Sequence, residues 1–214
     1  MLWERLARLI DSLDDRATVA FDGPDAAGKT FVADAVAARV RRPTVRASID
    51  GFHKPREVRL RHGVSAPDSY YNDGFDYGAL QARLLLPFRS GADSVDVAIY
   101  DYRRDVADIA VRRGLPAGAV LLCDGVFLLR NELRDQWTLR VYLDVTPETT
   151  LRRVVLRDAE LFGSAVAVVD RYKARYLPAQ ALYAADANPR ANAHIVIDNN
   201  DFENPRAISW EPPS

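Results

Sequence analysis

The chain has 214 residues, a length typical of a single domain. Its 29 Lys and Arg side chains nearly balance 30 Asp and Glu, for a formal net charge of −1, and 48% of the residues are hydrophobic. This ordinary globular composition argues against a protein that coats nucleic acid, and no apolar run is long enough to span a membrane. We therefore expect one domain over residues 1–214, with no nucleic acid and no membrane among its partners.

The cysteine content and the first residues bear on the cellular compartment. The chain has 1 cysteine, Cys123, which excludes an internal disulfide and a cysteine-based zinc site. The start Met-Leu-Trp-Glu-Arg lacks the basic-then-apolar order of a signal peptide. A cytoplasmic location is therefore expected.

The first elements in chain order are a helix, a strand and a second helix. Over residues 2–13, leucine and isoleucine recur at helical spacing with charges between them, which predicts an amphipathic helix that covers the core. Residues 17–21 form a β-prone run ending at Asp22-Gly23, and residues 31–40 are alanine-rich with helical periodicity. The pattern predicts a strand, a glycine loop and a helix.

The middle of the chain predicts a segment that faces the substrate. Residues 44–49 are a candidate strand, and residues 51–72 are polar and aromatic without a clear period. A helix and a hairpin are expected next, over residues 77–88 and over residues 95–100 with 109–112. We interpret residues 50–115, approximately, as a substrate-binding excursion from the sheet.

The last third of the chain predicts the centre of the sheet and a lid. The apolar runs 120–123 and 139–143 are typical of parallel strands that are covered on both faces. Thr146 and Pro147 suit the start of a helix. The remaining expectations are a helix to about residue 158, helices from 164 to about 185, a lid over about 152–176, a strand at 194–197, and a loose, proline-rich tail at 204–214.

A phosphate-binding motif is the strongest functional signal. Gly23-Pro-Asp-Ala-Ala-Gly28-Lys29-Thr30 satisfies the pattern G-x-x-x-x-G-K-[ST] between a predicted strand and a predicted helix. In that setting Lys29 reaches phosphate oxygens and also serves catalysis, and the Thr30 hydroxyl is offered to Mg²⁺. The residues expected on the nucleotide are Gly23, Asp25, Ala26, Ala27, Gly28, Lys29, Thr30 and Phe31.

The acidic residue inside the loop, Asp25, is unusual beside phosphates. Its carboxylate is expected to point away from them, toward the acceptor or a basic partner. The alternative for the whole motif is a glycine turn with a surface lysine.

Two further carboxylates follow predicted strands, at the edge of the sheet where ligands of α/β proteins gather. Asp50 is a candidate general base and a candidate Mg²⁺ ligand, and the alternative is a cap of the next turn. Asp124 is a candidate Mg²⁺ ligand through water, and the alternative is a residue that only helps the chain to turn. Phe52 and His53 follow Asp50 and are candidate acceptor contacts, although a structural histidine fits equally well.

An aromatic and charged run, from Ile99 to Arg104, ends another predicted strand. Tyr100, Asp101, Arg103 and Arg104 are candidate acceptor contacts because such a mixture stacks against a ring and forks onto oxygens. The alternative is a solvated hairpin tip.

Arginines of the predicted lid complete the candidate site. They flank Leu161-Phe162-Gly163, which is a candidate hinge, and arginines that close over a transferring phosphoryl group stabilise its charge. Arg157 and Arg171 are the candidate catalytic residues, and the alternative for each is a solvated helix face. The arginines considered are Arg152, Arg153, Arg157, Arg171 and Arg175.

Together these motifs resemble the uridine kinase and phosphoribulokinase group of phosphate-loop kinases, over about residues 18–199. The resemblance rests on the phosphate loop, Asp50-Gly-Phe-His, Ile99-Tyr-Asp-Tyr, Asp124-Gly-Val-Phe-Leu-Leu, Val141-Tyr-Leu-Asp-Val and Arg171-Tyr-Lys-Ala-Arg-Tyr-Leu-Pro. It implies an α/β P-loop NTPase fold of the nucleoside-kinase-like kind, with three layers: a parallel sheet and helices on both faces.

The resemblance also implies ATP with Mg²⁺ as cofactors and transfer of a phosphoryl group to a hydroxyl of a nucleoside- or sugar-like small molecule. Asp50 matches the catalytic aspartate, Tyr100-Asp101 the acceptor-binding pair, and Asp124 an acidic position that is usually glutamate. No histidine follows Tyr100-Asp101, where nucleoside-binding members have one. The sequence therefore predicts that uridine and cytidine are poor acceptors and that Arg103 and Arg104 favour carboxylate or phosphate oxygens.

Two alternatives from other classes remain, a nucleotide-dependent switch that binds a partner and a degenerate ATP-binding module without turnover. A GTPase would need an Asn-Lys-x-Asp motif, and none of the lysines has that neighbourhood. A homo-oligomer is compatible with the sequence.

Overall fold

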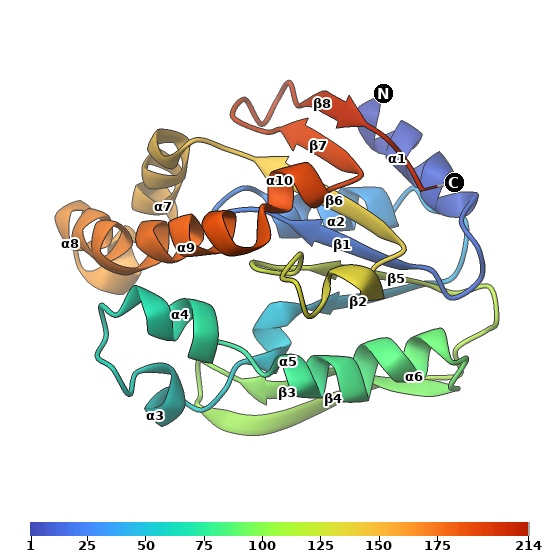
Figure 1. The fold of residues 1–214 in the computed structure, drawn as a ribbon, viewed down its shortest axis with the longest axis horizontal. Helices are drawn as coiled ribbons and strands as arrows, with labels where there is room; N and C mark the ends of the chain where they lie inside the picture. Colours follow the sequence, from blue (N-terminus) through green and yellow to red (C-terminus); the bar gives the residue numbers. More distant parts are fainter. Residues whose placement is uncertain (214) are drawn as a thin grey trace.

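The computed structural model describes residues 1–213. Its centre is a 6-stranded sheet in the order β2-β5-β1-β6-β7-β8 (Figure 1). Every neighbouring pair is parallel except β7 and β8, which are antiparallel. The strands are β1 Thr18–Asp22, β2 Thr44–Ser48, β5 Val120–Asp124, β6 Leu139–Asp144, β7 Ile195–Asp198 and β8 Arg206–Trp210.

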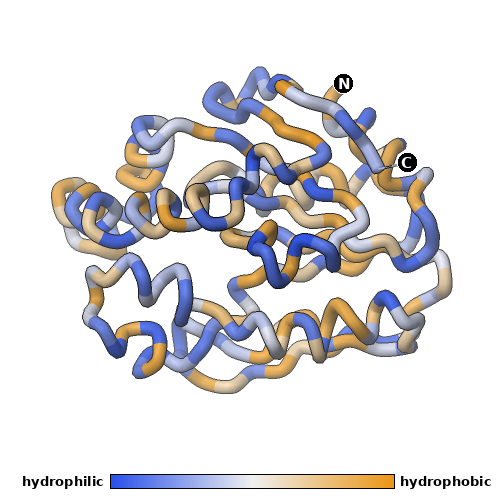
Figure 2. Tube along the Cα trace, in the orientation of Figure 1, coloured by the Kyte–Doolittle hydropathy of each residue, from blue (hydrophilic) through white to orange (hydrophobic). Residues whose placement is uncertain are grey.

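Helices cover both faces of the sheet, because alternate residues of its buried strands point to opposite sides. Val19 and Phe21 of β1 pack in a core with α1 (Leu2–Asp11) and α2 (Lys29–Ala37). Ala20 faces a second core, formed with the helices of the excursion and with α9 (Leu177–Ala187). The central strands are mostly hydrophobic in Figure 2. The three-layer α/β fold expected from the sequence is confirmed.

The excursion contains more regular structure than its polar sequence suggested. After β2 the chain forms short helices, a continuous helical stretch and an antiparallel hairpin of β3 with β4 that lies below the sheet in Figure 1. These elements are η1 Ile49–Phe52, α3 Arg56–Arg59, α4 Pro67–Asp73, α5 Tyr77–Leu80, η2 Gln81–Leu85, α6 Leu86–Arg89, β3 Ser94–Asp101 and β4 Val106–Arg113.

The predicted lid is a pair of helical arms joined at Gly163, which ends the first arm with φ +83°. The Thr146 side chain caps the start of that arm by accepting a hydrogen bond from the Thr149 amide. The second arm runs without a break into α9, with Pro178 in the first turn of that helix. The elements here are η3 Arg134–Gln136, α7 Pro147–Phe162, α8 Ala165–Arg171, η4 Tyr172–Tyr176, α9 and α10 Pro189–Asn192.

The expectation of a loose tail is wrong for residues 206–210, which form strand β8 against β7. Trp210 ends this strand and packs beneath the guanidinium group of Arg5, 3.8 Å from the ring centroid. The prolines that suggested disorder flank the strand and do not interrupt it. Ser214, the last residue of the expected tail, lies outside the described residues. Within residues 1–213, no helix is both long and apolar enough to cross a bilayer.

Candidate active site

The glycine loop connects β1 directly to α2, so the first amide groups of α2 face the loop interior. Gly28 caps this helix in a left-handed conformation, with φ +89°. At Gly23, an added Cβ would lie 2.4 Å from the Leu143 carbonyl oxygen, so only glycine fits the close approach of β1 and β6. The local geometry is that of a loop whose backbone can surround an anion.

The Lys29 ammonium group folds over the loop and donates a hydrogen bond to the Pro24 carbonyl oxygen at 2.6 Å. Burial lowers the pKa of Lys29, and nearby carboxylates, of which Asp25 and Asp22 act most strongly, oppose this shift. The ammonium group therefore lies among carboxylates at the place where a phosphate chain would be held.

The Thr30 hydroxyl and Asp124 are adjacent because β1 and β5 are neighbours in the sheet. Thr30 Oγ1 donates to Asp124 Oδ2 at 2.7 Å, and Asp124 is 2% exposed. A hydroxyl and a carboxylate are oxygen ligands of the kind that Mg²⁺ prefers, and Mg²⁺ commonly takes its other ligands from water and phosphates. Within residues 1–213 no group of three or more His, Cys, Asp or Glu side chains has metal-binding geometry, so the residues fit a cation shared with a phosphate chain.

Asp50 lies in η1 at the end of β2, with its side chain open to solvent. Protein atoms on the other sides of the carboxylate still exclude part of its water, and this desolvation is the main reason that the pKa of Asp50 is raised to about 6. The negative charges of Asp124 and Asp25 act in the same direction, while Lys29 and Arg157 oppose it. The carboxylate is therefore poised to change its protonation near neutral pH.

The alternative role for Asp50, a helix cap, is filled by another residue. Ser48 caps η1, because its hydroxyl accepts a hydrogen bond from the Asp50 amide at 3.3 Å. Within residues 1–213 no hydrogen bond to the Asp50 carboxylate is formed. The side chain is thus available to a ligand.

Phe52 and His53, both predicted to contact the acceptor, are held by the core. Phe52 is 0% exposed and packs in the main hydrophobic cluster, so its assignment as an acceptor contact is wrong. His53 stacks on Tyr102 at 4.5 Å, lies 4.4 Å from Phe75, and shares a 2.9 Å hydrogen bond with the Asp50 carbonyl oxygen. Burial lowers the pKa of His53 to about 4, so it is a neutral ring that fixes the segment around Asp50.

Most polar residues between Ile99 and Arg104 bond to one another within the hairpin, as the alternative of a solvated hairpin tip predicted. Tyr100 donates to Asp105 at 2.8 Å, and Asp101 accepts from the amides of Arg103 and Arg104 at 2.9 and 3.1 Å. Arg104 pairs with Asp101 at 3.7 Å and with a second aspartate of the hairpin. The Asp101 carboxylate therefore holds the turn, whereas Arg103 is exposed and within electrostatic range of Asp50.

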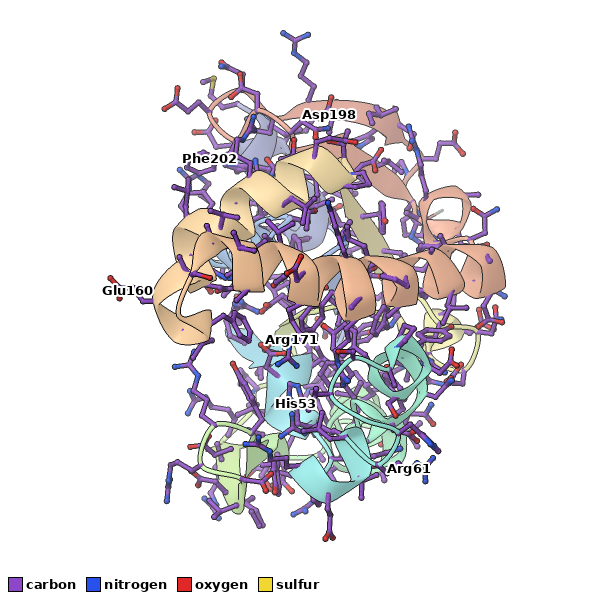
Figure 3. All side chains as sticks on the ribbon, turned by 90° about the vertical axis from the view of Figure 1, so that its left-hand side faces the viewer. His53, Arg61, Glu160, Arg171, Asp198 and Phe202 are labelled. Carbon is purple, nitrogen blue, oxygen red and sulfur yellow. The ribbon has the colours of Figure 1, made fainter. Side chains whose placement is uncertain are left out.

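Arg157 and Arg171, the two predicted catalytic arginines of the lid, form hydrogen bonds to other groups of the protein. Arg157 forms a bidentate pair with Asp158 at 2.7 and 2.9 Å. The Arg171 side chain extends from the lid to the excursion, where it donates to the Val64 carbonyl oxygen at 3.0 Å. In Figure 3 it lies above His53. Their catalytic roles remain predictions that require these bonds to be exchanged for bonds to phosphate.

A third lid arginine, Arg153, contacts the phosphate loop. Its guanidinium group donates to the Ala26 carbonyl oxygen at 3.1 Å and to the Asn199 carbonyl oxygen at 2.6 Å. It thereby joins α7 to the loop and to the end of β7.

Asp25 points toward the acceptor side of the molecule. Its carboxylate accepts from the Tyr70 hydroxyl at 3.2 Å and from the Gln180 amide at 3.3 Å. Tyr70 belongs to α4 and Gln180 to α9, so the side chains bonded to the Asp25 carboxylate within residues 1–213 are neutral donors. Asp25 links the phosphate loop to the excursion.

Asp22, at the base of the loop, was not singled out by the sequence. It is fully buried and accepts from the amides of Gly23 and Leu129 at 2.7 and 3.1 Å and from the Tyr183 hydroxyl. Burial raises the pKa of Asp22 to about 6, against these hydrogen bonds and the charge of Lys29. A carboxylate that ends an apolar strand just before the glycine loop is the signal that marks this position.

A surface depression beside the loop was also missed. It has a volume of about 600 Å³, and Phe202 at its rim meets Phe31 edge-on at 5.6 Å. The labelled Phe202 lies near the upper helices in Figure 3. The lining residues are Thr149, Arg152, Arg153, Asn200, Asp201, Phe202 and Glu203. An aromatic ring, arginines and amide groups beside a phosphate loop suit a nucleotide base.

A smaller hollow of about 290 Å³ lies on the other side of Thr30. It is bounded by Asp124 and Arg46 of the sheet and by Val97 of the hairpin. The candidate metal position thus opens to solvent between the sheet and the excursion.

A mostly parallel sheet with a strand–phosphate loop–helix unit, and carboxylates at the same edge, is the arrangement of a P-loop nucleotide-binding protein. No family model matches the chain. Uridine-cytidine kinase B of Dictyostelium discoideum is 26% identical over 176 residues, which is 81% of this chain and 71% of that protein. Uridine kinase of Lactococcus lactis (strain MG1363) is 26% identical over 170 residues, 70% of this chain and 73% of that protein.

The fold is shared with a solved structure of a possible uridine kinase from Bacillus stearothermophilus. The TM-score is 0.73 at 21% sequence identity, over 91% of this chain and 96% of that one. Sequence and fold together support the uridine kinase- and phosphoribulokinase-like family of P-loop kinases, the family that the motifs resemble. The prediction of a phosphotransferase is thereby confirmed.

Proposed function

We propose that this protein transfers the γ-phosphoryl group of Mg-ATP to a hydroxyl group of a nucleoside- or sugar-like small molecule. The observation that carries the proposal is the meeting of Lys29, Thr30, Asp124 and Asp50 at one edge of the sheet. The names of the relatives, which are uridine kinases, support a nucleoside-like acceptor.

In this proposal the loop amides and Lys29 hold the phosphate chain, and Thr30 and Asp124 hold Mg²⁺ at the same place. The bound Mg²⁺ would neutralise charge on the β- and γ-phosphates. Asp50 accepts the proton of the acceptor hydroxyl as its oxygen bonds to the γ-phosphorus, while the bond to the β-phosphate oxygen breaks and ADP leaves. A free carboxylate with a pKa of about 6 suits this role, because it is mostly ionised at neutral pH.

Two side chains near Asp50 are candidates to contact the acceptor. Arg103 on the hairpin and the phenol of Tyr70 on α4 both lie within electrostatic reach of Asp50. The chain lacks a histidine after Tyr100-Asp101, so recognition of a pyrimidine base loses hydrogen bonds, each worth about 0.5–1.5 kcal/mol. We therefore keep the prediction that uridine and cytidine are poor acceptors.

The deciding experiment measures ADP release from Mg-ATP with nucleosides, sugars and their phosphorylated or carboxylated derivatives. Turnover with any small hydroxyl acceptor above the rate of ATP hydrolysis supports a kinase. A kcat/KM for uridine above about 10⁴ M⁻¹s⁻¹, the lower end of ordinary enzyme efficiency, would overturn the prediction about pyrimidines. Tight Mg-ATP binding without turnover across the panel would favour the nucleotide-binding module without activity.

A further inference from the structure

Arg46 is an arginine of β2 whose guanidinium group connects three elements beside the candidate metal position. Its Nε donates to Asp34 on α2 at 2.9 Å, and one terminal nitrogen donates to Asp124 Oδ1 at 2.7 Å. The other terminal nitrogen donates to the Leu122 carbonyl oxygen of β5 at 2.7 Å. The Arg46 side chain is 24% exposed, so protein surrounds most of it.

The two oxygens of Asp124 have different partners. Oδ1 accepts from Arg46, and Oδ2 accepts from the Thr30 hydroxyl at 2.7 Å. The Asp124 side chain is 3% exposed, and a buried carboxylate requires a charged or hydrogen-bonding partner to stay ionised. Arg46 supplies that charge from the side opposite Thr30, which leaves Oδ2 directed at the hydroxyl.

Arg46 also holds the helix that carries Thr30. Asp34 lies one turn further along α2 than Thr30, so the Arg46–Asp34 bond ties α2 to β2, and the Arg46–Asp124 bond ties the same guanidinium group to the end of β5. The planar fork of an arginine fixes the angle between its bonds, which a lysine cannot do. One side chain thereby links the two elements that carry the candidate Mg²⁺ ligands.

We infer that Arg46 is the positioning residue of the magnesium site: it orients Asp124 and α2 so that the Asp124 carboxylate and the Thr30 hydroxyl meet at the cation. All three of its nitrogens donate to protein acceptors. Arg46 therefore affects the cation indirectly, through Asp124, which it bonds, and through Thr30, whose helix it holds. The inference rests on the proposed function, because it assumes that a Mg²⁺–nucleotide complex binds at the loop.

The test compares ADP binding by calorimetry in EDTA and over a titration of Mg²⁺, for the wild type, Arg46→Met and Arg46→Lys. Arg42→Met is the matched control: Arg42 comes just before β2 and is 15% exposed, but it pairs with Asp15 and with carbonyl groups at the opposite end of the strand from Asp124. ADP binding in EDTA reports a general loss of structure, whereas the dependence of ADP binding on Mg²⁺ reports the positioning of the metal ligands.

For Arg46→Met we expect ADP affinity in EDTA within about threefold of the wild type. The Mg²⁺ concentration for half-maximal enhancement should rise at least about tenfold, the effect of about 1.4 kcal/mol. Arg46→Lys should recover part of this loss because it restores the charge without the fork. Arg42→Met should respond to Mg²⁺ as the wild type does.

The other outcomes distinguish failure of the inference from failure of the proposed function. An unchanged Mg²⁺ response in Arg46→Met overturns the inference alone. A wild type that binds no ADP with or without Mg²⁺ overturns the proposed function and the inference with it. If Arg46→Met does not fold, Asp34→Ala decides, since Asp34 is 64% exposed and alanine leaves no acceptor for Arg46 on α2. A Mg²⁺ response of this variant equal to the wild type's overturns the inference, and a weaker one supports it.

Discussion

At the scale of single residues, the chemistry depends on which carboxylates are free and which are bonded. Asp124 is bonded to Thr30 and Arg46, and Asp25 to Tyr70 and Gln180. Within residues 1–213 no hydrogen bond reaches the Asp50 carboxylate, and the protein atoms around it exclude enough water to raise its pKa to about 6. This difference separates the candidate base from the candidate metal ligand, although all three are aspartates, and Asp124 and Asp25 are close enough to affect the charge of Asp50.

Replacement of Asp50 by asparagine should affect turnover far more than nucleotide binding. The amide keeps the size of the side chain but cannot accept the proton of the acceptor hydroxyl. We expect kcat to fall at least about a hundredfold, the usual contribution of a general base, with the Kd for ATP changed less than about threefold. Steady-state kinetics and calorimetry check both values, and near-normal turnover would make Asp50 a structural residue.

The pH dependence of kcat provides a second test of Asp50. A general base works in its ionised form, so activity is present above its pKa and is lost as the pH falls through that value. With the pKa of Asp50 raised to about 6, we expect kcat to decline below about pH 6. The residual activity of Asp50→Asn should lack this decline, and a wild-type profile that stays flat down to pH 5 would contradict the assignment.

At the scale of elements, buried polar contacts join the phosphate loop to helices that are distant in sequence. Tyr183 on α9 donates to Asp22 below the loop and accepts from the Leu129 amide at 2.9 Å. Arg153 joins α7 to the same loop through Ala26. The loop therefore depends on the packing of the lid arms as well as on its own glycines.

Tyr183→Phe should destabilise the protein at pH 7. The ring still fills its place, but buried Asp22 loses a donor and the Leu129 amide loses an acceptor. A hydrogen bond to a charged group contributes about 1.5–3 kcal/mol, and we expect that loss in the free energy of unfolding measured in urea. Tyr142→Phe is the control, because within residues 1–213 the phenol of this buried tyrosine forms no hydrogen bond.

The sign of the pH effect on this variant follows from Asp22. Burial raises the pKa of Asp22 to about 6, above its ordinary value of 3.8, so the folded state favours the neutral acid. The stability that comes from binding this proton is present below about pH 4 and is lost as the pH rises through 6. The deficit of Tyr183→Phe should therefore shrink from pH 7 to pH 5, and a constant deficit would contradict a charged Asp22 at neutral pH.

At the scale of the whole molecule, nucleotide binding should stabilise the fold by mass action. A ligand at a hundred times its Kd adds about 2.7 kcal/mol, which corresponds to a rise in Tm of roughly 5–10 °C for a chain of this size. The phosphate loop joins β1 to α2 in the middle of the sheet, so binding there should protect the cooperative unit as a whole.

Lys29→Ala should remove most of this stabilisation together with activity, because one ammonium group serves both ground-state binding and the transition state. Thermal unfolding with and without Mg-ATP measures the effect. Arg41→Ala is the control, since Arg41 is 84% exposed and pairs with Asp11 away from the loop. A wild-type melting curve that saturating Mg-ATP leaves unmoved would show that the phosphate-loop assignment is wrong.

Local signals in the sequence were enough to predict the phosphate loop, the central strands and the three-layer fold. The loop motif needs its glycines and lysine at fixed positions, and strands such as residues 120–123 need apolar residues on both faces. The last residues of parallel strands and the first residues after them lie at one known edge of the sheet, which is why Asp50 and Asp124 could be predicted to lie there. These features depend on neighbours in the chain.

Contacts between distant segments could be decided only by the tertiary structure. The sequence could not show that Phe52 turns into the core, that Arg46 reaches Asp124, that Asp25 meets α4 and α9, or that residues 206–210 add a strand beside β7. Each depends on the order of the strands and on the paths of the connections between them. A residue pattern sets which face of an element is buried, but the partner across that face is chosen by packing of the whole chain, to which residues far apart in sequence contribute together.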